Sequence, residues 1–118
     1  MTTDKNITID AAGKSLGRLA SQIASILTGK NTTTYARNIF PDVKVNVINA
    51  AKITVAAKAS VAKEYKTFSG YPSGLRKEKQ GALAKRLGYS EVLWRAVNGM
   101  VPINRLRTKI MKNLTIKD

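Results

Sequence analysis

The tripeptide Gly13-Lys14-Ser15 is the first place in this chain where residue types and spacing could do chemistry. It stands between a β-branched segment and an apolar pattern of helical spacing, where the phosphate-binding loop of a nucleotide hydrolase would stand. Such a loop needs another glycine five positions before Gly13, and Thr8 occupies that position. The motif therefore fails, and a capping turn, in which Lys14 could touch one backbone phosphate, is the better interpretation.

Other catalytic arrangements are equally incomplete. The chain has no histidine and no cysteine, which excludes Ser-His-Asp and Cys-His arrangements and thiolate zinc sites. The internal acids Asp10, Asp42 and Glu64 stand singly in different segments without metal-ligand spacing, which is typical of salt-bridge partners. A carboxylate or lysine enzyme stays conceivable, but we expect no enzyme, no cofactor, no metal and no small-molecule substrate.

The charge balance indicates a binding protein. Lys and Arg number 21 against 7 Asp and Glu, a formal charge of +14, and such self-repulsion destabilises an isolated compact state. Nucleic acid is the first candidate partner, because phosphate neutralisation releases counterions. An anionic membrane surface, an acidic protein and mere solubility are the alternatives. No segment reaches the roughly 20 apolar residues of a membrane helix, and Met1 to Asp10 lack a signal-peptide pattern, so we expect a cytoplasmic protein without a membrane partner.

A basic loop is predicted over residues 58–80. From Lys58 to Arg86 there are eight basic residues against two acids, and Ser69 to Gly74 form a turn-rich segment. Tyr71 in this turn can stack on an unpaired base, while the glycines allow close approach to another surface. A tight turn with a buried tyrosine is the alternative, and the residues alone leave both open.

The last helix, over residues 104–114, is predicted to be amphipathic. Asn104 can cap it, and its apolar side chains Leu106, Ile110, Met111 and Leu114 would face inward. The outer face carries four positive charges and no acid, which favours phosphate contact over a solvated face. A helix in a DNA major groove, as in a dimeric DNA-compacting protein, is the rival, but the face shows no base-reading pattern.

The elements that position these residues follow from periodicity. Ile7 to Asp10 alternate as a strand, and apolar residues from Leu16 to Leu27 recur at helical spacing, with Ser15 as N-cap and Gly29 just past the end. A polar loop over residues 31–41 follows, and it carries Tyr35, Arg37 and Phe40.

Two further strands are predicted at Val43–Ile48 and at Ile53–Ala57, followed by helices at residues 77–87 and from Ser90 to the Gly99–Pro102 stop. Strand, helix, strand in this order indicates a βαβ unit with parallel pairing. The expected fold class is α/β, a single domain over residues 1–118 with a mostly parallel sheet of about four strands flanked by helices.

Four ordered segments resemble one protein family: residues 9–21 (IDAAGKSLGRLAS), 47–53 (VINAAKI), 69–75 (SGYPSGL) and 97–106 (VNGMVPINRL). They resemble the bacterial-type ribosomal protein thirteen family of the large subunit, and they cover nearly the whole chain. The chain departs from the family pattern by lacking histidines in its loops, and by having Ser73 and Arg107 where glycine is usual.

The resemblance implies a protein of the ribosome that binds large-subunit rRNA, acts early in subunit assembly, and neighbours other large-subunit proteins. We expect no homo-oligomer. The residues expected to bind rRNA are basic, aromatic or turn residues of the segments above: Lys14, Arg18, Tyr35, Arg37, Lys52, Lys58, Lys66, Ser69, Gly70, Tyr71, Pro72, Gly74, Arg76, Lys77, Arg105, Arg107, Lys109 and Lys112.

Overall fold

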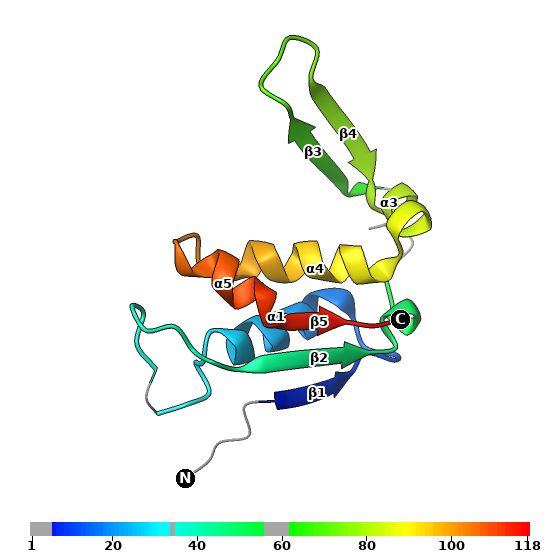
Figure 1. The fold of residues 1–118 in the computed structure, drawn as a ribbon. Coiled ribbons are helices and arrows are strands. Elements are labelled where there is room, and N and C mark those ends of the chain that lie inside the picture. Colours follow the sequence, from blue (N-terminus) through cyan, green and yellow to red (C-terminus); the bar gives the residue numbers. More distant parts are fainter. Residues whose placement is uncertain (1–5, 34, 56–61) are drawn as a thin grey trace.

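A computed structural model describes residues 6–33, 35–55 and 62–118. Its central sheet has the order β1-β2-β5, and both pairings are parallel, with Ile7 opposite Val45 and Val47 opposite Ile116 (Figure 1). A separate antiparallel hairpin, β3–β4, rises away from this sheet. The elements are β1 (Asn6–Asp10), α1 (Leu16–Leu27), β2 (Lys44–Ile48), the 3₁₀ turn η1 (Ala50–Lys52), β3 (Glu64–Phe68), β4 (Leu75–Lys79), α3 (Gln80–Leu87), α4 (Tyr89–Met100), α5 (Leu106–Lys112) and β5 (Leu114–Ile116).

The core forms on one face of the sheet. Alternation in β2 buries Val45 and Val47 completely and leaves Lys44, Asn46 and Ile48 exposed. The apolar stripe of α1, which includes Leu19 and Ile23, is buried against the same core. Helix α4 packs against α1 through its own buried face, on which Leu93 lies. The β1–α1–β2 unit with parallel strands confirms the predicted α/β class.

The last strand corrects the predicted C-terminal helix. Helix α5 ends at Lys112, and Leu114 lies in β5 instead of the last helical turn. Residues 114–116 form a strand because they pair with the free edge of β2. The Val45 N–H donates to the Asn113 carbonyl at 2.9 Å, and the Lys117 N–H donates to the Val47 carbonyl at 2.8 Å. Leu114 is still buried, as predicted, but in the sheet.

The predicted strand at Ile53–Ala57 is wrong over the part that the structure describes. Thr54 makes only an isolated parallel bridge with Ser15, so the parallel sheet has three strands among the described residues, and four are not found. Residues 56 and 57 lie outside the described ranges.

The predicted basic loop over residues 58–80 is also corrected. Residues 64–79 form the β3–β4 hairpin, with Lys66 opposite Lys77 and Phe68 opposite Leu75. The helix expected from residue 77 therefore begins only at Gln80, after the strand ends. Residues 58–61 lie outside the described part of the chain.

Candidate nucleic-acid interface

The hairpin tip, residues 68–75, presents apolar side chains to solvent. Tyr71 is 75% exposed, Phe68 68% and Leu75 54%. The alternative of a tight turn around a buried tyrosine is therefore wrong, and Tyr71 is available to a base or sugar. Lys66 and Lys77, which are paired across the strands behind the tip, are exposed as well.

The backbone of the tip is tightly folded. The Gly74 N–H donates to the Tyr71 carbonyl at 3.0 Å, and a Cβ on Gly74 would stand 2.9 Å from that same oxygen. Gly70 has a φ of +88° and Ser73 a φ of +62°. Glycine at residue 70 is thus favoured by its conformation and at residue 74 by lack of space, and both belong to the turn that exposes Tyr71. Ser69 and Pro72 are exposed in the same turn.

Helix α5 carries a cationic stripe. Arg105, Lys109 and Lys112 are exposed and are spaced four and three residues apart, so they lie on one side of the helix. Asn104 caps the helix as predicted, since its Oδ1 accepts hydrogen bonds from the backbone N–H groups of residues 106 and 107 at 3.0 and 3.1 Å. Arg107 departs from the predicted outer face, because it is half-buried one turn before the buried Met111.

The loop before β2 joins this helix. Tyr35 and Arg37 line a cavity of about 310 Å³ together with Asn104 and Leu106 at the start of α5. Both side chains are exposed. The structure thus brings Tyr35 and Arg37 to the start of α5, the helix that carries the cationic stripe, although Arg37 and Asn104 stand 67 positions apart in sequence.

Lys14 and Lys52 form a third group at the carboxyl ends of β1 and β2. The Gly13 N–H donates to the Lys52 carbonyl at 3.1 Å, which holds the two turns together. Asp10 partly balances this charge, because a hydrogen bond from the Asn49 amide, another from a backbone N–H, and the two lysines lower the pKa of its carboxyl. Arg18 is exposed one turn into α1.

The expected rRNA-binding residues therefore fall into three groups and not one. The hairpin tip and α5 lie far apart, with α4 running between them (Figure 1). Lys58, also expected in the interface, lies outside the described residues. An interface built on all three groups would span most of the molecule, whose longest dimension is 51 Å.

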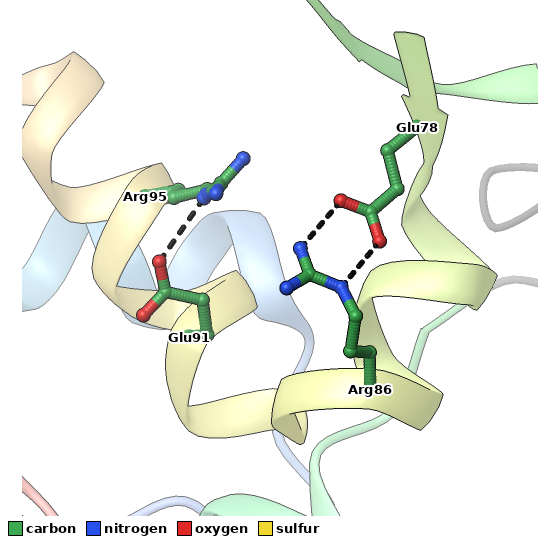
Figure 2. A network of polar contacts seen from close by, with 4 residues as sticks. All are labelled: Glu78, Arg86, Glu91 and Arg95. Atoms are coloured by element: carbon green, nitrogen blue, oxygen red, sulfur yellow. Dashed lines mark hydrogen bonds and ion pairs between the residues drawn. The ribbon is translucent and has the colours of Figure 1, made fainter. Parts of the chain in front are cut away.

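Sequence reasoning missed a polar network at the base of the hairpin (Figure 2). Arg86 donates to both carboxylate oxygens of Glu78, from Nε at 2.9 Å and from an Nη at 2.8 Å, while Arg95 donates from Nε to Glu91 at 3.1 Å. The Arg86 hydrogen bond lowers the pKa of Glu78. The Arg95 guanidinium also lies 5.1 Å from the ring centroid of Tyr65. Residues 65–68 combine aromatic and β-branched side chains directly before a turn, a pattern that is typical of a strand. This pattern could have predicted β3, the strand that carries Tyr65.

Within residues 6–33, 35–55 and 62–118, no helix is long and apolar enough to cross a membrane. The same residues bring together no group of three or more His, Cys, Asp or Glu side chains that could hold a metal ion.

Comparison with known proteins decides the family. The family model described as Ribosomal protein L13 matches residues 4–117. The chain belongs to the ribosomal protein L13 family. Large ribosomal subunit protein uL13 of Caldanaerobacter subterraneus subsp. tengcongensis is 44% identical over 108 residues, which are 92% of this chain and 75% of that relative. The uL13 proteins of Gloeothece citriformis and Chlamydia pneumoniae are 43% and 38% identical over 116 residues, 98% of this chain and 76% of each relative.

Membership in the L13 family confirms the resemblance seen in the sequence. It makes this chain a ribosomal protein, which is a structural component of the ribosome in the cytoplasm and not an enzyme. The glycine-lysine-serine turn at the start of α1 is accordingly part of the fold and not of a hydrolase site.

Proposed function

We propose that this chain is a structural constituent of the large ribosomal subunit that binds large-subunit rRNA and supports an early step of subunit assembly. The relatives named above are large-subunit proteins. The observation that carries the rRNA contact is the presence of two separate exposed cationic surfaces. One is formed by Lys66, Arg76 and Lys77 on the hairpin strands behind the tip, and the other is the α5 stripe, which lies far from the hairpin tip (Figure 1).

The proposed mechanism is that of a scaffold. Each cationic surface neutralises phosphates of a separate rRNA segment, and the core between them fixes the distance at which the two segments are held. Helix α4 is suited to this role because its buried face packs against α1, so it cannot shift without opening the core. The whole chain acts as one domain, and other large-subunit proteins are its further partners.

Early action in assembly follows from the same arrangement. A protein that joins two rRNA segments reduces the conformational freedom of the RNA between them, so later proteins meet a preformed site. The formal charge of +14 also implies that the protein itself is stabilised by the RNA, because bound phosphates screen its self-repulsion. We propose that it does this as a monomer.

The test uses the purified full chain with protein-free large-subunit rRNA and with an equal mass of bulk transfer RNA as competitor. We expect the chain to sediment with the large-subunit rRNA, in the presence of the competitor, at salt concentrations at which it no longer binds transfer RNA. Depletion of the protein in cells should lead to accumulation of incomplete large-subunit particles. Equal retention by both RNAs, or a full complement of mature subunits after depletion, would exclude the proposal.

A further inference from the structure

A cavity of about 560 Å³ opens between the hairpin and the helices behind it. Its hairpin side is the inner face of β3–β4, where Tyr65 pairs with Glu78 and Thr67 pairs with Arg76. Its helical side is made by Arg86 of α3 and Arg95 of α4. We call this cavity the hairpin cleft. Its volume lies within the range of about 300 to 1,000 Å³ that is typical of small-ligand pockets.

The charge of the hairpin cleft favours an anion. Its lining includes the cationic side chains of Arg76, Arg86 and Arg95 against the single carboxylate of Glu78, while Lys77 alternates with Arg76 and Glu78 along β4 and adds its charge from the opposite face of the hairpin. Glu78 engages one edge of the Arg86 guanidinium, so its remaining N–H groups stay available as donors in a fixed orientation (Figure 2). Arg76 makes no ion pair with any described residue. Guanidinium groups so placed suit the bidentate recognition of phosphate.

The hairpin cleft also contains a flat surface. Tyr65 is half-buried, and burial raises the pKa of its hydroxyl. The Arg95 guanidinium lies 5.1 Å from the Tyr65 ring centroid and is held in place by Glu91 at 3.1 Å. Tyrosine rings and guanidinium planes are the surfaces on which proteins stack unpaired RNA bases. A phosphate alone would use the arginines but would leave this platform and most of the volume empty.

We propose that the hairpin cleft binds one unpaired nucleotide of the rRNA, with its phosphate against Arg76 and Arg86 and its base on the Tyr65–Arg95 platform. This inference rests on the proposed rRNA binding and adds to it a site for a single nucleotide. If the Glu78–Arg86 ion pair served only to fasten the hairpin to α3, and Glu91 paired with Arg95 only within α4, Arg76 and Thr67 would have no part in RNA binding. The variants below separate these two interpretations.

The experiment measures binding of the full chain to a fluorescein-labelled adenosine tetranucleotide by anisotropy, and to large-subunit rRNA by filter retention. Arg76→Gln should weaken tetranucleotide binding about tenfold, since it removes the unpaired phosphate donor. Thr67→Glu places a carboxylate in the hairpin cleft without breaking either ion pair, and should weaken binding at least as much. The matched control is Lys85→Gln, which removes one exposed charge on α3 outside the cleft and should change the affinity less than about twofold.

The outcomes are distinguishable. If the wild-type chain does not retain large-subunit rRNA, the proposed function fails and the hairpin cleft loses its ligand. If rRNA is retained but Arg76→Gln and Thr67→Glu bind the tetranucleotide as Lys85→Gln does, the cleft proposal is overturned while the proposed function stands. Tyr65→Leu tests the base: an affinity equal to that of wild type would contradict stacking. Circular dichroism of each variant confirms that the fold is intact, and Thr67→Glu, at an exposed strand position, keeps the test decisive if the tyrosine variant unfolds.

Discussion

Replacing Arg105, Lys109 and Lys112 together by glutamine should remove the contribution of α5 to rRNA binding. The three side chains are exposed on one side of the helix, and α5 contains no acid. Each neutralised duplex phosphate contributes about 0.9 to the slope of log affinity against log salt, so three contacts contribute about 2.7. At 0.1 M salt this corresponds to a loss of about 500-fold in affinity, if all three residues contact phosphate. Glutamine has a helix propensity close to that of lysine and arginine, so α5 itself should persist.

The assay is filter retention of labelled large-subunit rRNA over a series of salt concentrations. The matched control is the triple variant of Lys44, Lys85 and Lys117 to glutamine, which removes the same charge from three exposed positions on different elements. We expect the slope to fall by between 2 and 3 for the α5 variant and by less than about 1 for the control. Equal slopes for the two triple variants would refute the reasoning, because binding would then depend on total charge and not on the α5 stripe.

Three further predictions concern the scaffold that positions these surfaces. Asn104→Ala removes the side-chain cap of α5 and should lower the free energy of unfolding by about 1 kcal/mol in urea titration, with an unchanged value contradicting the capping role. Ser73→Gly should raise the free energy of unfolding by up to about 1 kcal/mol, since it relieves a φ of +62° at the hairpin tip; a lower value would show that the serine is not strained. The pKa of Asp10 is lowered in the folded state by the Asn49 amide and the Ala12 N–H, so its stabilisation is present above the ordinary pKa of 3.8 and is lost as pH falls through the folded value. The stability difference between wild type and Asp10→Asn, measured by denaturation at a series of pH values, should therefore shrink on acidification, and a constant difference would argue against it.

Local patterns were enough to predict a large part of the fold. The alternation of Ile7 to Asp10 and the helical spacing of Leu16 to Leu27 predicted β1 and α1 close to their observed bounds, because each pattern repeats over its whole element. The same holds for β2 and for the Asn104 cap. The exposed stripe of α5 was also predicted, except for Arg107, whose half-burial depends on how the helix is rotated against the core.

The hairpin cleft shows why the other part could not be predicted. Tyr65 and Arg95 stand 30 positions apart, and they meet only because the hairpin register turns one face of β3 toward α4. The pairing of Glu78 with Arg86 depends likewise on the strand ending where α3 begins. None of these relations leaves a periodic signal in the sequence.

The sequence by itself determined the charge surplus, the absence of histidine and cysteine, the βαβ start and the family. These properties are sums over the chain or patterns between near neighbours, so no tertiary contact is needed to establish them. Only the tertiary structure decided that residues 114–116 form a strand, that the basic loop is a projecting hairpin, and that the cationic residues divide into separate surfaces. The physical reason is that β5 forms on the open edge of β2, and the hairpin cleft forms between the β3–β4 hairpin and the helices α3 and α4, so each depends on partners that are distant in sequence.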